Sequence, residues 1–352
     1  VEAADLEAGM RIARPRQLPT PQAGDRLDWF ERLDGKRIYV TVEESFARTH
    51  DFPVEEHFVG KKRRAMSGLR QGADFDAIAS DTGLTRKTVA QYARELDAGR
   101  FEETPRTVSL AYLRQHFEYA DLADAIEAIK YANANNARSR SITPPDRLDA
   151  ELARFVGLVI SEARIDDGRI RFYNTNEQLL EQFASTLERR FGLEPERTER
   201  KGVPMVTVQS QTLVHYLTEL FDVMGDGIGS RILRAETDAR AAFLRAMFDA
   251  ESYVSPKRVI ELTQKDGDVI TLLGYLLASF GIPSRRKREQ KAASNGSGTE
   301  REYHTLLVSG GDALARFESA IGFSIDEKRE RLSGLTDQPA NPNQDTLPMQ
   351  EG

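Results

Sequence analysis

Two apolar stretches that each end in a single acid constrain this chain more than any other feature. Residues 152–163 read LARFVGLVISEA, and residues 243–254 read FLRAMFDAESYV. Each stretch is long enough for about three helical turns. The closing acid is Glu162 in the first and Glu251 in the second. Similar apolar and turn patterns follow both stretches in the same order, which indicates that a whole unit is repeated.

The repeated unit is predicted to run helix, strand, strand, helix, strand, strand, helix. Strands are expected at 169–173 and 258–262, shortly after the two acids. Each leads to a helix in which apolar residues recur every three or four positions. These helices end alike, with Phe-Gly-Leu at 191–193 and Phe-Gly-Ile at 280–282, where glycine suits a helix C-terminus.

The paired units resemble the LAGLIDADG homing endonucleases, whose nine-residue signature aligns with 155–163 and 244–252. The resemblance covers about 144–335. It implies an α+β fold, a pseudo-two-fold duplicate of αββαββα repeats in which the two signature helices pack together. Small residues would let these helices approach closely, and the sequence supplies Gly157 and Ser161 in the first stretch and Ala246 and Ala250 in the second. The ninth signature position, usually Gly in the family, is Ala163 and Ser252 here.

The resemblance also implies that Glu162 and Glu251 hold Mg²⁺ or another divalent cation. Two carboxylates brought close raise each other's pKa unless a cation lies between them. Mg²⁺ takes oxygen ligands and keeps several waters, so it would polarise the scissile phosphate and activate a water. Family members carry a basic residue beyond each acid, and counting from the glycine that ends the last helix of each unit gives Lys328 and Arg231.

Basic residues recur on the predicted strands of both units. Arg169, Arg171 and Tyr173 alternate with apolar Ile170 and Phe172, so one face of that strand is polar and the other is buried. The further basic positions expected to contact double-stranded DNA are Arg197, Arg200, Lys201, Lys257, Arg258, Arg285, Arg286, Lys287 and Arg288. Contacts to phosphates would supply affinity, and contacts to base edges would supply sequence reading.

A second DNA-binding element is predicted in the first half of the chain. Residues 74–99 have the small residue, turn glycine and apolar anchor of a helix-turn-helix, at Ala79, Gly83 and Val89. Thr85 is a suitable N-cap for a helix exposing three residues to the major groove. These are Arg86, Lys87 and Gln91. A plain helical hairpin is the competing interpretation. Four basic residues at 61–64 precede this element, and residues 107–138 are expected to be helical and to complete the domain.

The composition and net charge of the sequence indicate which source organism and cellular location to expect. The formal net charge is −7, and the basic residues comprise 38 Arg and 11 Lys. Acidic, Lys-poor chains are typical of halophilic organisms, in which salt screens the repulsion between like charges, so we expect an origin in a halophilic archaeon. The absence of Cys and of any run of 18 apolar residues predicts a cytoplasmic protein without a membrane span.

The first 20 residues resemble the segment of inteins that joins the splicing blocks to an inserted endonuclease, which makes the halves of a parent intein expected partners. The nucleophile and the His-Asn pair needed for splicing are not found at the ends of the sequence. The expected parts are an intein-like segment at 1–25, a small β region at 26–60, a helical DNA-binding domain at 61–143, two repeats at 144–230 and 231–335, and a return linker at 336–352.

Two functions from different classes remain open. The first is a monomeric, site-specific endonuclease of an intein, cutting double-stranded DNA with Glu162, Glu251, Lys328 and Arg231. The second is a non-catalytic DNA-binding regulator that uses the same scaffold together with the helix-turn-helix. The retained acid pair favours the first, and the missing glycines at the ninth positions favour the second.

Overall fold

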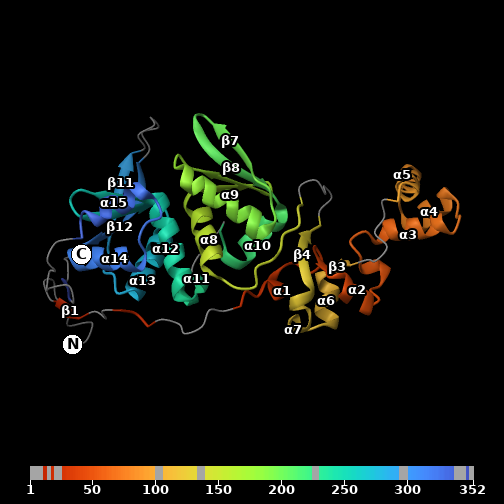
Figure 1. Cartoon of the computed structure of the whole chain (residues 1–352), viewed down its shortest axis with the longest axis horizontal. Helices are drawn as coiled ribbons and strands as arrows, with labels where there is room; N and C mark the ends of the chain where they lie inside the picture. The colour runs from red at the N-terminus through yellow and green to blue at the C-terminus, as the bar shows by residue number, and fades with distance from the viewer. Residues whose placement is uncertain are drawn as a thin grey trace.

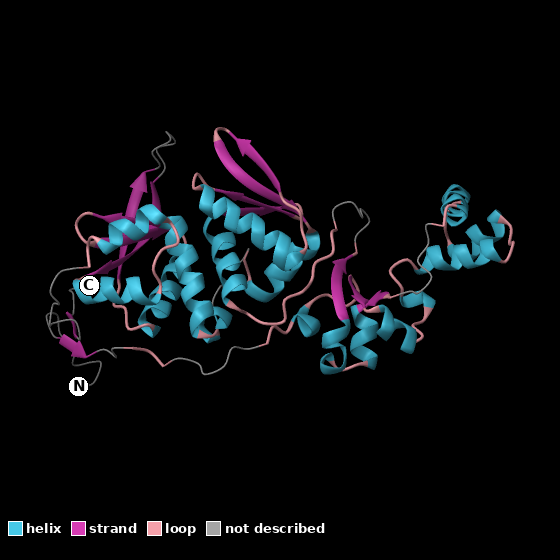
Figure 2. Cartoon of the chain, viewed as in Figure 1, coloured by secondary structure: helices cyan, strands magenta, loops and turns pink. Residues whose placement is uncertain are grey.

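A computed structural model describes residues 11–13, 17–19, 26–99, 106–132, 139–223, 230–292, 300–336 and 346–348. The molecule is elongated (Figure 1), with a small group of helices at one end, a small α/β part next to it, and two larger α/β units beyond. Figure 2 shows the helices of each large unit gathered on one side of its sheet.

The first large unit has the predicted element order. Its elements are α8 (Ala150–Glu162), β5 (Ala163–Asp166), β6 (Arg169–Tyr173), α9 (Glu177–Phe191), β7 (Glu196–Arg200), β8 (Val203–Gln209) and α10 (Gln211–Phe221). The strands form an antiparallel sheet in the order β5-β6-β8-β7. Asp149 starts α8 by accepting a 2.9 Å hydrogen bond from the Leu152 amide. Ile170 and Phe172 of β6 are buried against the helices, as their alternation predicts.

The second large unit repeats this order of elements and strands. Its elements are α12 (Thr237–Glu251), β9 (Ser252–Ser255), β10 (Val259–Gln264), α13 (Gly267–Ser279), β11 (Arg285–Ala292), β12 (Glu300–Ser309) and α14 (Gly311–Ala320). The sheet order is β9-β10-β12-β11, all antiparallel. Two further helices flank the unit, α11 (Ser230–Arg234) before it and α15 (Asp326–Ser333) after it.

The two units meet where α8 packs along α12. A Cβ atom placed on Gly157 would lie 2.8 Å from the Ala246 Cβ and 3.0 Å from the Phe243 carbonyl oxygen. Real Cβ contacts are longer than this, so only glycine allows the two helix backbones to come this close. The close approach agrees with the small residues predicted for this seam. It brings the C-terminal ends of both helices, and therefore both closing acids, into one region.

The small α/β part is built around β2. It contains α1 (Trp29–Arg32), β2 (Ile38–Val42), α2 (Glu44–Thr49), β3 (Thr107–Ser109), α6 (Leu110–His116), α7 (Tyr119–Leu122) and β4 (Ile126–Tyr131), with single 3₁₀ turns at Val54–Glu56 and Ala123–Ala125. The sheet order is β3-β2-β4. Trp29 is 1% exposed, and its ring makes edge contacts with Phe30 and Tyr119 at centroid distances of 5.8 Å. The Tyr131 amide donates to Thr212 Oγ1 at 3.0 Å, which joins this part to the first large unit.

The helical prediction for residues 107–138 was wrong in part. Only α6, α7 and the turn after them are helical, whereas 126–131 is a strand that pairs with β2. Ile126 and Ile129 have helical spacing, but Ile129 and Tyr131 also alternate and are buried opposite β2. Pairing with a distant strand overrides the local pattern. Consequently the regions predicted at 26–60 and 61–143 share one sheet, and the last residues, 133–138, lie outside the described part.

Three helices form the separate group at the end of the molecule. They are α3 (Gly60–Arg70), α4 (Phe75–Thr82) and α5 (Arg86–Asp97). Their core is Ala65, Ile78 and Val89. Gly83 ends α4 with φ of 66°, and Thr85 caps α5 by accepting a 3.2 Å bond from the Thr88 amide. The chain segments before and after this helical trio lie next to each other beside the small sheet. The Phe58 amide donates to the Thr107 carbonyl at 3.0 Å.

Segments from the two ends of the described chain also come together. Strand β1 (Arg11–Ala13) pairs with β13 (Thr346–Pro348) in an antiparallel register. The Leu18 amide donates to the Ala278 carbonyl of α13 at 3.1 Å, so the chain after β1 follows the second large unit. Most of the regions predicted as an intein-like segment and a return linker lie outside the described residues. No helix within the described ranges combines the length and apolar character needed to cross a membrane.

Candidate active site

Glu162 and Glu251 are the last residues of the two helices that form the seam. The chain continues from each directly into the first strand of its sheet, through Ala163 with φ of −90° and Ser252 with φ of −98°. These are extended conformations that any residue adopts. The backbone therefore requires no glycine at the ninth signature position, and the departure from Gly causes no strain there.

The two carboxyl groups are partly buried and repel each other. Burial, together with the nearby charge of Glu251, raises the pKa of Glu162 to about 7. Burial also raises the pKa of Glu251, while the Gln264 side-chain amide and the Lys328 ammonium act in the opposite direction. Burial therefore disfavours the charged form of both carboxyl groups. A divalent cation between them would remove this penalty.

Lys328 supplies a positive charge next to this pair. Its Nζ donates to the backbone carbonyls of Phe248 at 3.0 Å and Asp249 at 2.7 Å, in the last turn of α12. The C-terminal end of a helix favours a cation. Burial lowers the pKa of Lys328, and the charges of Asp249 and Glu251 oppose that effect. The structure thus brings together three of the four residues predicted to be catalytic.

Arg231 is not part of this cluster. It belongs to α11, which precedes α12, so it lies beyond the N-terminal end of the helix whose C-terminal end carries Glu251. Its Nη2 forms a 2.6 Å ion pair with Asp28, and its Nε donates to the Leu220 carbonyl at 3.0 Å. The counting from the preceding glycine assumed that the end of the first unit has the same shape as the end of the second. Instead, Arg231 ties α1 to α10 and α11.

The two carboxyl groups fit a hard cation whose other ligands are phosphate oxygens and water molecules. No three His, Cys, Asp or Glu side chains gather into a metal site anywhere in the described ranges. Mg²⁺ commonly binds through one or two carboxylates together with phosphates and water. Gln264, which ends β10, was not predicted as a site residue, and its buried side-chain amide lowers the pKa of the Glu251 carboxyl. The only signal for it in the sequence is a polar amide at the end of an alternating strand.

The predicted DNA-contacting residues divide between the two faces of the sheets. We call the face away from the helices the open face. In the first unit Arg169, Arg171 and Tyr173 lie on it, opposite in alternation to buried Ile170 and Phe172. Arg169 and Arg171 line a hollow of about 470 Å³, together with Arg140. Arg140 and the neighbouring strand residue Arg164 were not predicted, although Arg164 directly follows the signature and alternates correctly.

The pairing register of the strands shows which face of the sheet each of the other basic residues occupies. Arg200 of β7 shares the open face, whereas Arg197 pairs with Glu177 and Glu181 on the helix side. In the second unit Arg285 and Lys287 lie opposite Leu307 and Thr305 on the open face. Arg286 and Arg288 face the helix side, where Arg286 donates to Thr271 Oγ1 at 2.8 Å. The remaining residues stand at turns between strands, namely Lys201, Lys257 and Arg258.

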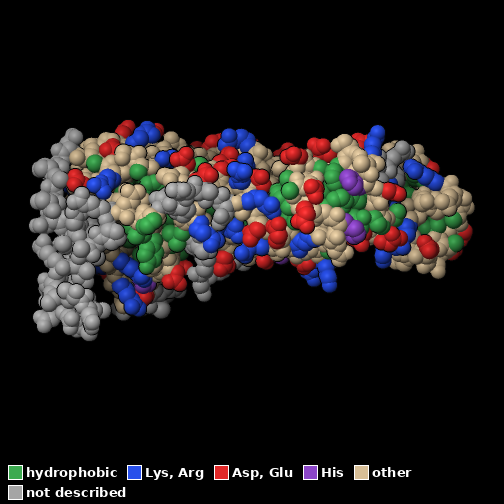
Figure 3. All heavy atoms as spheres, turned by 90° about the horizontal axis from the view of Figure 1, so that it is seen from below, with side chains coloured by type: hydrophobic (Ala, Val, Ile, Leu, Met, Phe, Trp, Pro, Cys, Tyr) green, Lys and Arg blue, Asp and Glu red, His purple; other side chains and the backbone are tan. Residues whose placement is uncertain are grey.

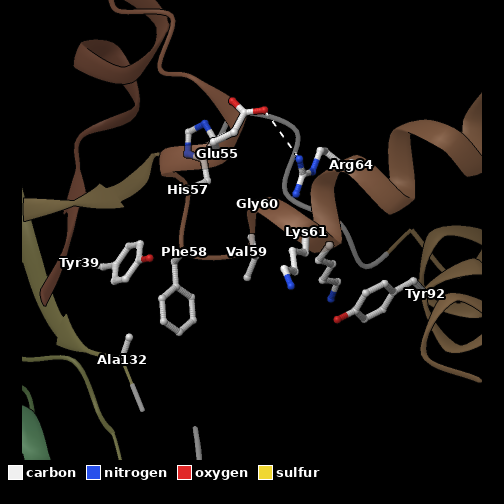
Figure 4. Close-up of a pocket in the computed structure, with 11 residues that line it drawn as sticks. Tyr39, Glu55, His57, Phe58, Val59, Gly60, Lys61, Arg64, Tyr92 and Ala132 are labelled. Carbon is white, nitrogen blue, oxygen red and sulfur yellow. Dashed lines mark ion pairs between the residues drawn. The ribbon is translucent and has the colours of Figure 1, made fainter. Parts of the chain in front are cut away.

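The predicted contact residues of α5 are all on its solvent side. Arg86, Lys87 and Gln91 are exposed. Arg86 pairs with Asp76 at 3.0 Å, and Gln91 Nε2 donates to Glu95 Oε1 at 3.2 Å. The basic run at 61–64 opens α3 and borders a hollow of about 510 Å³ between the helical trio and β2. Figure 4 shows Lys61, Tyr39, Phe58 and Tyr92 around this hollow. Among the described residues on the face drawn in Figure 3, basic and acidic side chains are mixed.

Comparison with known proteins identifies the domain but not the whole chain. A family described as the LAGLIDADG-like domain matches residues 149–220 and 238–322. The chain therefore carries a LAGLIDADG-like domain, and the match covers most of the two large units.

The chain also aligns with segments of longer proteins. It is 30% identical over 231 residues to the replication factor C small subunit of Thermococcus kodakarensis, covering 60% of this chain and 25% of that protein. It is 26% identical over 320 residues to an A-type ATP synthase subunit of Methanopyrus kandleri, covering 86% of this chain and 30% of that protein. The chain thus spans about a quarter to a third of these relatives.

Two kinds of solved structure are similar to part of the chain. One is I-DmoI in complex with DNA and Mn, with 16% identity, a TM-score of 0.37, and coverage of 50% of this chain and 97% of that one. The other is full-length DUF199/WhiA from Thermatoga maritima, with 14% identity, a TM-score of 0.38, and coverage of 56% and 63%.

Proposed function

We propose that this chain, which carries a LAGLIDADG-like domain, is a site-specific endonuclease that hydrolyses both strands of a DNA duplex. The observation that supports this most strongly is the carboxyl pair at the seam. Glu162 and Glu251 come from different units, both have raised pKa values, and Lys328 lies beside them. A buried pair of like charges destabilises a fold. Binding of a cation between the two carboxylates would explain why the pair is present.

In this proposal the two units are duplicated halves related by an axis between α8 and α12. The open faces of their sheets then form one continuous DNA-binding surface with the acids at its floor. Its basic residues are Arg169, Arg171, Arg200, Arg285 and Lys287, together with Arg140 and Arg164. Their ion pairs with neighbouring acids, such as Arg171 with Asp166, would be exchanged for pairs with phosphates.

The chemistry proposed is hydrolysis of one phosphodiester bond in each strand. A water oxygen adds to phosphorus as one of its protons passes to solvent, the bond from phosphorus to the leaving sugar oxygen breaks, and that oxygen takes up a proton from solvent. Mg²⁺ held by Glu162 and Glu251 would neutralise the developing negative charge and lower the pKa of the attacking water. Glu162 and Glu251 would act in the ionised form, as ligands of the metal. The Lys328 ammonium adds positive charge on one side of the two carboxylates.

We further propose that the chain is the insert of an intein from a halophilic archaeon. Two observations support an inserted element. The aligned relatives have unrelated names, a replication factor and an ATP synthase component, and the chain matches only a minor part of each. Strands β1 and β13 pair, so the segments 11–13 and 346–348 lie side by side, as an insertion into a continuous host fold requires. The Arg-rich, acidic composition supports the halophilic origin.

The helical trio is proposed as a second DNA reader, a helix-turn-helix whose α5 enters the major groove with Arg86, Lys87 and Gln91. A tethered second module raises the effective concentration of the first at its site. The alternative function, a non-catalytic DNA-binding regulator, is supported by one observation. The basic residue expected beside Glu162 is absent from the cluster, because Arg231 pairs with Asp28 instead.

A single selection experiment separates these functions. The protein is incubated with Mg²⁺ and a library of duplex DNA with a randomised segment, and cut ends are captured by adaptor ligation and sequenced. An endonuclease enriches one sequence family with a fixed cut position, and the E162Q/E251Q double variant still binds that sequence but leaves it uncut. Selective binding with no cutting by the unaltered protein would support the regulator. Equal cutting by the double variant would remove the acid pair from the site.

A further inference from the structure

A second acid of α12, Asp249, is buried one helical half-turn before Glu251. Asp249 is 1% exposed. Its carboxylate accepts three hydrogen bonds: from the Ser324 amide at 3.0 Å, from the Ser324 hydroxyl at 2.6 Å, and from Arg154 Nη2 at 3.1 Å. A buried carboxylate with this many charge-assisted or backbone donors is firmly held.

Ser324 belongs to the short segment that leads into α15, the helix that carries Lys328. Two of the three bonds to Asp249 come from this one residue. Four residues later, the Lys328 ammonium donates to the carbonyls of Phe248 and Asp249 itself. Asp249 is therefore fixed to α15 at two points, through its side chain to Ser324 and through its backbone to Lys328. The contact between the Asp249 side chain and Ser324 fixes the position of the start of α15. It therefore also fixes the position of Lys328, which lies in the first turn of that helix.

Arg154 connects the same cluster to the other unit. It lies on α8, and its Nη2 also donates to the Ser324 hydroxyl at 2.8 Å, while its Nε donates to Gln182 Oε1 on α9 at 3.0 Å. Its pairing with Asp249 crosses the seam between the two helices. The start of α15 is thus held from both units, in a place that water hardly reaches.

Within its described residues, the first unit has no equivalent of this arrangement. Ile160 stands two residues before Glu162, where Asp249 stands before Glu251, and an isoleucine side chain accepts no hydrogen bond. The charge that would correspond to Lys328 is also missing, since Arg231 lies at the other end of α12. Among the described residues, the acid pair is therefore flanked by a positioned cation on the side of Lys328 and not on the other.

We propose that Asp249 is a positioning residue that sets Lys328 beside the acid pair through Ser324, and that this makes the site one-sided. The one-sidedness rests on the proposed endonuclease function, because it predicts that the two DNA strands depend unequally on Lys328. Loss of Asp249 or of the Ser324 hydroxyl slows cutting of one strand and leaves nicked DNA. The placement of Lys328, by contrast, is a property of the protein alone and is testable without cleavage.

The first measurement is the modification rate of the Lys328 amine. The folded protein is treated with an amine-reactive reagent, and the peptide containing Lys328 is quantified by mass spectrometry. We expect D249N and S324A to raise this rate at least fivefold, while the exposed Lys257 reacts as before. S324A leaves the Arg154–Asp249 pair intact, so it covers the case in which D249N does not fold. S319A, which removes an exposed hydroxyl that bonds only the Arg316 carbonyl at 3.3 Å, is the matched control. An unchanged Lys328 rate in both variants overturns the proposal.

The second measurement follows both strands of a selected target, each with its own label, in single-turnover cleavage. We expect S324A and D249N to slow one strand about tenfold and the other less than twofold, with DNA affinity in EDTA within twofold of the unaltered protein. K328Q gives the same bias, and adding D249N to K328Q costs nothing more, because both act through one ammonium. Equal slowing of both strands, or additive losses, overturns the one-sided role. If Lys328 becomes reactive but the unaltered protein cuts no DNA, the positioning stands and the endonuclease function fails.

Discussion

Replacing Glu162 by Gln in the metal-free protein should make the fold more stable at alkaline pH. Burial and the charge of Glu251 raise the pKa of Glu162 from 4.5 to about 7. Below pH 4.5 the carboxyl group is protonated in both the folded and the unfolded chain, so the folded state loses nothing. Between pH 4.5 and 7 the unfolded chain releases the proton while the folded one retains it, and stability falls as pH rises. Above pH 7 the loss is complete.

The size of the effect follows from the two pKa values. At about 1.36 kcal/mol per pH unit, their separation corresponds to about 3 kcal/mol in the free energy of unfolding. The carboxyl group is only partly buried, so solvent screens part of this, and we expect ~1.5 kcal/mol. Gln is neutral at every pH and similar in shape. E162Q should therefore exceed the unaltered protein by ~1.5 kcal/mol at pH 8, and by a few tenths of a kcal/mol at pH 5.

Urea unfolding followed by circular dichroism, in EDTA at pH 5 and pH 8, measures this difference. The matched control is E188Q, since Glu188 is an exposed acid on the surface of α9. Its stability difference should be close to zero at both pH values. The reasoning would be refuted by an E162Q variant that is equally or less stable than the unaltered protein at pH 8, or by the same gain at both pH values.

Three further outcomes follow from other contacts. Gly157→Ala should destabilise the fold by roughly 1–3 kcal/mol through overpacking, whereas Gly274→Ala, with its nearest neighbour at 3.8 Å, should be neutral or stabilising. Thermal melting measures both variants, and equal midpoints would argue against close packing of α8 and α12. Saturating Mg²⁺ should raise the melting temperature of the unaltered protein at pH 8 but not that of E162Q/E251Q; equal shifts would place the metal elsewhere. Replacing residues 60–105 by a short Gly-Ser linker, which the 3.0 Å bond from Phe58 to Thr107 permits, should shorten the DNA footprint on one side and keep the cut position; a footprint of unchanged length would leave the trio a structural hairpin.

The repeated pattern of the sequence predicted the order of helices and strands found in both large units. Apolar residues at helical spacing and alternating strand residues carry that information locally, and the caps at Asp149, Gly192 and Thr85 lie where their residue types predict. The seam was expected from the resemblance to the LAGLIDADG family, and Gly157 is the small residue at which the two helix backbones come close.

What the sequence did not reveal depends on contacts between distant residues. Strand β4 exists because Ile129 and Tyr131 pair with β2, some 90 residues earlier, and its local spacing resembles a helix. Arg231 has the residue type and position of a site residue, yet Asp28 is its partner. Gln264 and Asp249 were missed because nothing in their neighbouring sequence indicates which distant group each one faces. Which face of β7 or β11 a basic residue occupies required the register of the pairing strands.

The buried Trp29 gives this protein an internal optical reporter. It is the single tryptophan of the chain, and its ring is enclosed by Phe30 and Tyr119 in the small α/β part, away from the seam. Its emission should therefore shift to longer wavelength when that part opens, whatever the state of the two large units. Circular dichroism at 222 nm instead averages over all helices, most of which belong to those units. If the two signals change at the same denaturant concentration, the parts unfold as one cooperative body; if fluorescence changes first, the small α/β part melts independently of the two large units.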